Sequence, residues 1–464
     1  MLIIIKFIIS IFIYNIYYMV NKKYTCGCNN KLITRIPNTN RTVAIGDLHG
    51  DLSAAIYTLL VADVIAIITE QEKSSYEYVS VVLTNTRKNT TNIVYIIWVG
   101  GSTQVVQVGD QIDRCRYNKD KEDSCIKPFK DDENSDIKIL NLYTKIDFLA
   151  KKTGGRLISL FGNHEIMNIL ENDFRYVSPM GSFNHADLSK FDFKYLSSLY
   201  NTNKTEYMKK YNEGLKARAQ EFNNYYRTYL ACTRQSVIII GGILFVHGGI
   251  LDFYNNNNTI DNMESINIQV QTQLLINEKL SEDLRSIFWD RHVDNMERDN
   301  IRYIEEENNE EDIKCHSNIE NYTTNYSYID RHDIQDIEED GVENDVENNI
   351  NDDKYYKAHV VKDIYKNKKK YSNTDSEIHC SIYDEIFNEY NITGLVVGHT
   401  VQNKLSAYGI NSSCDQRIWR IDIGLSAAFN SCRPNIRREL EVLEINYTSD
   451  NKPTFNILSR KYKK

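Results

Sequence analysis

The chain has 464 residues and a net charge of -9. This length is enough for one large domain or two ordinary ones, with ample material for a core. The acidic balance offers no strongly basic face, so the sequence predicts no nucleic-acid partner. The chain contains 32 Tyr and only 5 Pro, and this compositional bias gives any single Tyr little weight.

Residues 1–41 form an apolar N-terminal segment and a linker. Residues 2–20 are mostly Ile, Phe, Tyr and Leu, over the length of a secretory signal or a signal-anchor helix. No small-residue cleavage site follows, and Lys22 and Lys23 favour keeping the rest of the chain on the cytoplasmic side. Initiation at Met19 and a poorly ordered tail are the alternatives. The location stays open between membrane-anchored or secretory, through residues 2–20, and cytoplasmic.

Five apolar runs each end in a glycine beside Asp, Asn or His. The polar residues that follow these runs are Asp47, His49, Asp110, Asn163, His164, His247 and His399. Buried strands place such residues at one edge of a sheet, where α/β proteins bind ligands. Oxygen and imidazole donors suit borderline divalent metals such as Mn, Fe and Zn. The repetition of one pattern therefore predicts a metal site.

The segments between these runs have recognisable patterns. Helical spacing is expected over 52–68, 137–151 and much of 250–285, and a polar insertion over 70–92. The Tyr- and Phe-rich stretch 172–236 has helical periodicity, and we expect it to form a cap whose aromatic residues are mainly core. Acidic runs and few apolar residues predict a disordered insertion over 295–380.

These patterns divide the chain into parts. The expected parts are the segment and linker 1–41, a catalytic domain of 42–294 with the cap at 172–236, the insertion 295–380, the rest of the catalytic domain at 381–448, and a tail at 449–464.

Nine Cys are present, without paired Cys-x-x-Cys zinc spacing. A disulfide between Cys115 and Cys125 is one interpretation of their spacing. Unpaired thiols are the favoured one.

Taken in order, Asp-x-His, Gly-Asp-x-x-Asp-Arg, Gly-Asn-His-Glu, His-Gly-Gly and Gly-His resemble the calcineurin-like metallophosphoesterases. Phe-Trp-Asp-Arg at 288–291, Gly-His-Thr-Val-Gln at 398–402 and the run 419–426 look like the Shewanella-like protein phosphatases, a branch with tyrosine-directed members. The resemblance covers about 42–445. It implies an α/β fold, a four-layer α/β/β/α sandwich of two mixed sheets with a helical cap insertion.

The resemblance also implies roles for the site residues. Two divalent ions (Mn, Fe or Zn) are held by Asp47 and His49 on one side, by Asn163, His247 and His399 on the other, and by Asp110 as the bridge. His164 protonates the leaving oxygen and Asp113 orients it. Arg114 binds phosphate together with Asn163, and Arg291 is a second arginine candidate.

Two residues depart from the family pattern. Val401 stands where many metallophosphoesterases have the second His of Gly-His-x-His, which leaves three protein ligands on the first metal. Cys115 stands where the protein phosphatases have Gly after Asp-Arg, so the turn that presents Arg114 differs.

The expected function is that of a metal-dependent phosphoprotein phosphatase, which hydrolyses phosphomonoesters through a hydroxide that two metals activate. Its expected partner is a phosphorylated protein or peptide. The alternatives are a nucleotide or dinucleoside polyphosphate hydrolase, and a catalytically weak phosphate-binding interaction module.

Overall fold

The computed structural model describes residues 32–85, 90–116, 124–186, 191–256, 263–295, 373–402, 409–432, 439–450 and 452–461. Within these ranges no helix combines the length and the apolar character needed to span a membrane. The apolar segment 2–20 and most of the acidic insertion lie outside the described residues.

Two six-stranded mixed sheets carry the fold. Sheet A contains, in spatial order, β1 (Arg35–Ile36), β9 (Val237–Ile240), β10 (Ile243–Val246), β11 (Gly394–Val397), β13 (Ile418–Arg420) and β12 (Asn411–Ser413). Sheet B contains β15 (Pro453–Lys461), β14 (Glu439–Tyr447), β2 (Arg41–Ile45), β6 (Gln104–Gln107), β7 (Arg156–Leu160) and β8 (Arg234–Gln235). In sheet B, β2, β6, β7 and β8 run parallel. In sheet A, β10, β11 and β13 run parallel. The carboxyl ends of the strands that carry the expected ligands therefore share an edge within each sheet.

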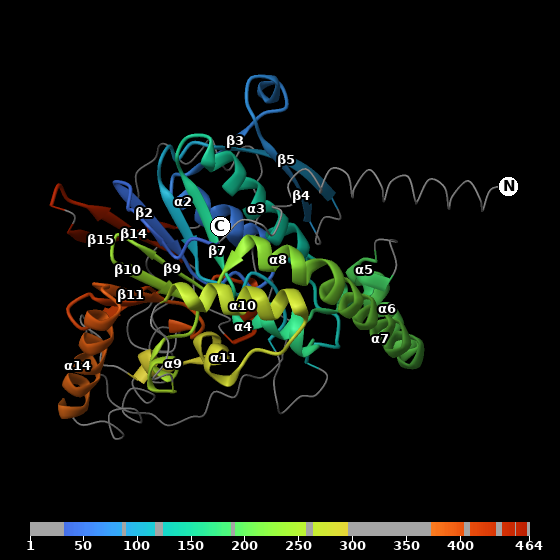
Figure 1. Cartoon of the computed structure of the whole chain (residues 1–464). Coiled ribbons are helices and arrows are strands. Elements are labelled where there is room, and N and C mark those ends of the chain that lie inside the picture. The colour runs from blue at the N-terminus through green and yellow to red at the C-terminus, as the bar shows by residue number, and fades with distance from the viewer. Residues whose placement is uncertain are drawn as a thin grey trace, which may run out of the picture.

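Helices cover the outer faces of the two sheets (Figure 1). On the side of sheet B lie α2 (Leu52–Val61) and α3 (Asp136–Lys151), and on the side of sheet A lie α9 (Leu251–Asn256), α10 (Glu264–Ile276), α11 (Glu282–Trp289) and α14 (Asn373–Glu389). The short segments are α4 (Asn163–Ile166), η1 (Glu72–Ser74), η2 (Met167–Glu171), η4 (His292–Asn295) and η6 (Ala427–Cys432). The arrangement is the expected α/β/β/α sandwich.

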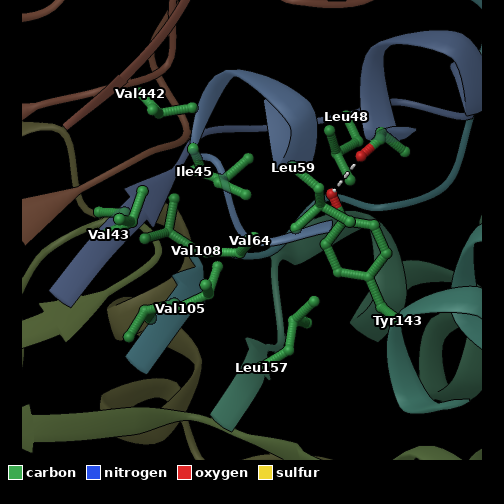
Figure 2. Packing of buried hydrophobic residues seen from close by; sticks show 14 of the residues in the cluster. Val43, Ile45, Leu48, Leu59, Val64, Val105, Val108, Tyr143, Leu157 and Val442 are labelled. Carbon is green, nitrogen blue, oxygen red and sulfur yellow. Dashed lines mark hydrogen bonds between the residues drawn. The ribbon is translucent and has the colours of Figure 1, made fainter. Parts of the chain in front are cut away.

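Side chains alternate between the two faces of each inner strand, as strand geometry requires. On β10, Ile243 and Phe245 belong to the core between the sheets, whereas Leu244 and Val246 pack under the helices on the other side. Both faces are buried, which explains why these strands read as continuous apolar runs. The cluster that contains Ile243 and Phe245 also includes the residues between sheet B and its helices. Figure 2 shows this part, in which Tyr143 of α3 packs beside the strands and donates its hydroxyl to the carbonyl of Ala55 at 2.9 Å.

The segment 172–236 is helical, as expected. It contains α5 (Pro179–Ala186), α6 (Phe193–Thr202), α7 (Lys204–Glu221), η3 (Phe222–Tyr226) and α8 (Arg227–Thr233). Helices α5, α6 and α7 extend to one side of the sandwich (Figure 1) and have a small core of their own, which includes Phe183, Tyr207 and Tyr211. Its aromatic side chains are therefore mainly core.

The structure differs from the expected elements in three places. The helix from Leu52 ends at Val61, because Asp63 adopts a left-handed φ of 52° and turns the chain. A third sheet then forms from β3 (Ile65–Ile68), β5 (Thr90–Trp98) and β4 (Val79–Asn85), where a helix end and a polar insertion were expected. Strands β1 and β15 belong to the main sheets, although a linker and a tail were predicted there.

The prediction of unpaired thiols is wrong for two pairs of cysteines. Cys115 and Cys125 form a disulfide, and so do Cys380 and Cys414. The first pair closes a loop directly after Arg114. The second joins α14 to the turn between β12 and β13, residues that are 34 positions apart in sequence.

Candidate metal centre

The expected ligands follow five strand ends that meet where the two sheets face one another. Asp47 follows β2, Asp110 follows β6, and Asn163 opens α4 after β7, all from sheet B. His247 follows β10 and His399 follows β11 in sheet A. The loops between strand and ligand are short, so the rigid sheets fix the positions of these side chains.

Four site residues have backbones in the left-handed region. The φ angles are 42° at His49, 53° at Asp110, 70° at Asp113 and 69° at His399. Non-glycine residues rarely adopt this conformation, which costs on the order of 1–3 kcal/mol each and tends to occur at functional sites. The local backbone is thus bent to aim these side chains inward.

Asp110 lies at the centre of the cluster. Its Oδ2 is 3.4 Å from His247 Nε2, 3.7 Å from His49 Nε2 and 3.8 Å from His164 Nε2. A carboxylate with imidazoles on both sides has the position that a bridging ligand needs. Its second oxygen accepts the backbone N–H of His164 at 3.0 Å, which holds the orientation of the carboxylate.

Nε2 of His247 faces the cluster. Its Nδ1 donates to the carbonyl of Val108 at 2.9 Å, which leaves Nε2 facing Asn163 Oδ1 at 2.9 Å. Two acceptor atoms that face each other at this distance require a proton or a metal ion beside them. The ring of His399 lies 4.9 Å from that of His247.

Asp47 Oδ1 and His399 Nε2 are buried polar atoms of the cluster that have no hydrogen-bond partner within the described part of the chain. Such atoms are costly unless a ligand satisfies them. The other oxygen of Asp47 accepts the backbone N–H of His399 at 3.0 Å, which ties the loops of the two sheets together. Asp110 belongs to two compact groups of possible metal ligands. One contains His49 and His164, and the other contains His247 and His399. The donor set fits two divalent metal ions.

The electrostatics agree with this fit. Burial raises the pKa of Asp47 well above its usual range, and the carboxylates of Asp422 and Asp110 raise it further. Burial alone would also raise the pKa of Asp110, but the surrounding imidazoles, first His247, hold it well below its usual range. Burial lowers the pKa of His399 and keeps the ring neutral, the form that binds metals.

Glu165 connects the loop after β7 to the loop after β6. Its carboxylate accepts the backbone N–H groups of Gly162, Asp110 and Gln111 at 2.7, 3.0 and 2.8 Å. Three donors on one buried carboxylate fix the loop after β7 against the loop after β6. Glu165, the last residue of Gly-Asn-His-Glu, therefore helps to fix the positions of Asp110 and Asn163.

His164 and Asp113 are paired as expected. His164 Nδ1 lies 2.8 Å from Asp113 Oδ2, so Nε2 faces the Asp110 carboxylate. Asn168 donates to the same oxygen of Asp113 at 2.9 Å.

The cap supplies a residue that the sequence analysis missed. Arg218 of α7 is fully buried, 3.4 Å from Asp113 Oδ1 and 2.8 Å from Asp136 Oδ2, and its Nε donates to Asn168 Oδ1 at 2.8 Å. An arginine among aromatic residues in a helical segment gave no signal of this contact.

The expected phosphate-binding residue Arg114 is 3% exposed and already engaged. It forms an ion pair with Asp51 at 3.1 Å and a longer one with Glu133 at 3.6 Å, and it donates to the carbonyls of Gly50 and Asp131. Burial alone would lower the pKa of Arg114, but these carboxylates raise it above its usual value. Contact between Arg114 and phosphate stays a prediction, and it would require some of these bonds to break.

Arg116 is the arginine whose guanidinium reaches the cluster. Its nitrogens lie 3.2 and 2.9 Å from the two ring nitrogens of His49, and the group stacks near Tyr176 and Phe429. Arg291 is exposed and donates to the hydroxyl of Thr400, the residue after His399, at 2.5 Å. Residue Cys115 between the two arginines of 114–116 is anchored by its disulfide.

Asp422 is the second residue that the sequence analysis left unassigned, although it lies in the run 419–426. It is fully buried after β13, beside Asp47 and His49. A strand end with an Asp was the available signal, but here no glycine precedes it.

This chain combines a sandwich of two mixed sheets with possible metal ligands at five strand ends. Metal-dependent phosphoesterases have this arrangement. Residues 41–403 match the calcineurin-like phosphoesterase family, and the chain belongs to it.

Individual relatives and solved structures match the chain to different extents. The Shewanella-like protein phosphatase 2 of Arabidopsis thaliana is 34% identical over 153 residues, which is 33% of this chain and 27% of that protein. The chain therefore matches only about a quarter of that relative's length. An uncharacterised protein of Acanthamoeba polyphaga mimivirus is 25% identical over 64% of this chain and 90% of its own length. Among solved structures, a cold-active protein-tyrosine phosphatase of a psychrophilic Shewanella species has a TM-score of 0.43 and 14% identity, covering 93% of this chain and 84% of that chain.

Proposed function

We propose that this protein is a phosphomonoesterase with two divalent metal ions and that its substrate is a phosphorylated protein or peptide. The observation that carries the proposal is the convergence of Asp47, Asp110 and His399, from three strand ends in two sheets, with buried ligand atoms that lack a hydrogen-bond partner among the described residues. Membership of the calcineurin-like phosphoesterase family supports it.

The residues divide into two ligand groups. Asp47 and His49 would hold one ion, Asn163, His247 and His399 the other, and Asp110 both. When bound, two divalent ions supply Lewis acidity toward phosphoryl oxygens and make water more acidic. We propose that the ions are Mn, Fe or Zn, because imidazole and carboxylate donors suit all three.

His164 would give a proton to the leaving oxygen. Asp113 accepts the hydrogen bond from Nδ1, which orients the ring so that Nε2 points toward the ligand cluster. Asn168 and Arg218 fix Asp113 in turn, so the dyad is rigid before substrate arrives. A positioned general acid typically contributes about 10²–10⁴ in rate.

Arg116 and Arg291 are the cations that we assign to the phosphoryl oxygens, with the Asn163 amide beside them. Arg116 is half-buried against Tyr176 and Phe429 and faces His49. A guanidinium suits phosphate because its planar fork donates two parallel hydrogen bonds. Contact between Arg116 and His49 Nε2 would have to be replaced when that nitrogen binds a metal.

The class of substrate rests on similarity to protein phosphatases. A nucleotide or dinucleoside polyphosphate hydrolase remains the second candidate, because the same ligand set serves both reactions. A catalytically weak phosphate-binding module is the third, and the intact dyad of His164 and Asp113 argues against it.

The test uses the purified full-length protein loaded with Mn²⁺. Hydrolysis of para-nitrophenyl phosphate, lost in His164→Asn with metal content unchanged, separates an enzyme from a binding module. Phosphotyrosine and phosphoserine peptides are then compared with diadenosine tetraphosphate. Faster turnover of a peptide supports the proposal, and turnover of diadenosine tetraphosphate alone contradicts it.

A further inference from the structure

Asp422 is brought to the metal centre by a close backbone contact. A Cβ at Gly46 would overlap the carbonyl of Ile421 and would lie 3.3 Å from the Cα of Asp422. Only glycine at position 46 allows the end of β2 and the loop after β13 to approach this closely. The contact places Asp422 next to Asp47, across the boundary between the two sheets.

The side chain of Asp422 is turned into the site. Its exposed fraction is 0%, and Oδ1 accepts the backbone N–H of Gly424 at 2.8 Å. A carboxylate oxygen of Asp422, one of Asp47 and a ring nitrogen of His49 all lie within 4.8 Å of one another. Asp47 Oδ1, the neighbouring buried oxygen, has no hydrogen-bond partner among the residues that the structure describes.

The loop of Asp422 is fixed from both sides. Gln402 donates its backbone N–H to the Asp422 carbonyl at 2.7 Å, and Ile421 donates to Val397 at 2.9 Å. Further along, Ser426 Oγ donates to the carbonyl of His49 at 3.0 Å. The carboxylate is therefore held in place relative to His49 before any ion binds, which reduces the cost of ordering a ligand.

The sequence explains why this position needs a ligand. The family pattern that the sequence resembles has a second His, in Gly-His-x-His, where this chain has Val401, an aliphatic side chain that cannot bind a metal. The first ion would then have only Asp47, His49 and the shared Asp110. Two buried carboxylates side by side, Asp47 and Asp422, repel each other unless a cation or a proton lies between them.

We propose that Asp422 is a protein ligand of the first metal ion and takes the place of the absent second histidine. The inference concerns metal binding only, so it does not depend on which phosphate ester is the substrate. A carboxylate in place of imidazole adds a negative charge, which favours harder, more oxygen-loving ions such as Mn²⁺ at this position.

The test compares Asp422→Asn with Asp132→Asn in the full-length protein. Asp132 is almost equally buried but is bonded to Ser178 Oγ and the Met180 N–H, both at 2.7 Å. Each protein is stripped with a chelator and titrated with Mn²⁺ in a calorimeter. The wild type and Asp132→Asn should bind two ions, whereas Asp422→Asn should lose affinity for one ion by at least about tenfold and keep the other.

Thermal melting separates a ligand from a structural residue. Without metal, Asp422→Asn should melt at or above the wild-type temperature, because one of two neighbouring buried charges is gone, and the rise in melting temperature on adding Mn²⁺ should shrink. Wild-type affinity for both ions in Asp422→Asn would overturn the proposal. So would a lowered melting temperature in the metal-free variant together with an undiminished response to Mn²⁺.

Discussion

Replacing Arg218 by Met should destabilise the metal-free protein by about 3–5 kcal/mol. Arg218 pairs with Asp136 at 2.8 Å and Asp113 at 3.4 Å, and all three side chains are nearly or fully buried. Removing one member of a buried ion pair leaves uncompensated charge, which costs on the order of 3–5 kcal/mol. Met keeps most of the apolar stem, so the loss reports the charge and its hydrogen bonds.

The assay is urea unfolding of the metal-free protein, followed by fluorescence. Arg227→Met is the matched control, because Arg227 of α8 donates to the carbonyls of Leu274 and Leu275 and to that of Asn223. Arg227→Met should lower the free energy of unfolding by about 0.5–1.5 kcal/mol for each hydrogen bond to a carbonyl that is lost. Arg218→Met combined with Asp136→Asn should recover part of the loss, because one stranded carboxylate is then neutral.

A second measurement ties this cap residue to catalysis. Without Arg218, Asp113 loses a partner that fixes its orientation, so kcat should fall while the Mn²⁺ content stays at the wild-type value. If Arg218→Met costs under about 1 kcal/mol and leaves kcat unchanged, the reasoning from the buried ion pair is wrong.

The site supports three further predictions. Asp110→Asn should lose both metals in elemental analysis, because Asp110 would serve both ions in the proposed site; retention of either at wild-type affinity would refute the bridge. Arg116→Ala should raise KM for para-nitrophenyl phosphate and the inhibition constant of inorganic phosphate by roughly tenfold or more, because one charge-assisted contact contributes about 1.5–3 kcal/mol. If both constants equal those of the wild type, Arg291 is left as the phosphate contact. Burial raises the pKa of Glu133 to about 7 from 4.5. The folded state therefore favours the protonated acid, so this stabilisation is present below pH 4.5 and is lost as pH rises through 7. Glu133→Gln should gain stability relative to wild type, on the order of 3 kcal/mol between pH 4 and 8, in unfolding curves of the metal-free protein, and a constant difference would contradict the shift.

The strand ends, and the convergence of the candidate ligands that follow them, were predictable from sequence because each motif is local. An apolar run, a glycine and a polar donor are adjacent in the chain, and the sheet edge brings the five motifs together. The helix Asp136–Lys151 was also predictable, because its apolar residues recur at helical spacing along its whole length.

The elements that could not be predicted depend on distant partners. The third sheet pairs β3 with β5 across a long separation, and the apolar run Ile65–Ile68 reads equally well as the end of the helix before it. Strand β15 alternates weakly and is identified by its pairing with β14. The disulfide between Cys380 and Cys414 likewise requires α14 to lie beside the turn after β12, which no local pattern shows.

Arg218 and Asp422 were not predicted from the sequence, for the same reason. Each acts through neighbours that are distant in the sequence, Arg218 through Asp113 and Asp136, and Asp422 through Asp47 and Gly46. The residue type alone does not distinguish them from surface charges. Only their burial does.

The order of the donors along the polypeptide has a consequence for biosynthesis. A ribosome adding roughly 5–20 residues per second makes Asn163 well before His399, with an interval on the order of 20 s between them. During that interval the nascent protein carries Asp47, His49, Asp110 and Asn163, but His399 and Asp422 have not been made. With the proposed ligands, the centre is complete when synthesis has passed Asp422, so occupancy by both ions is a late event.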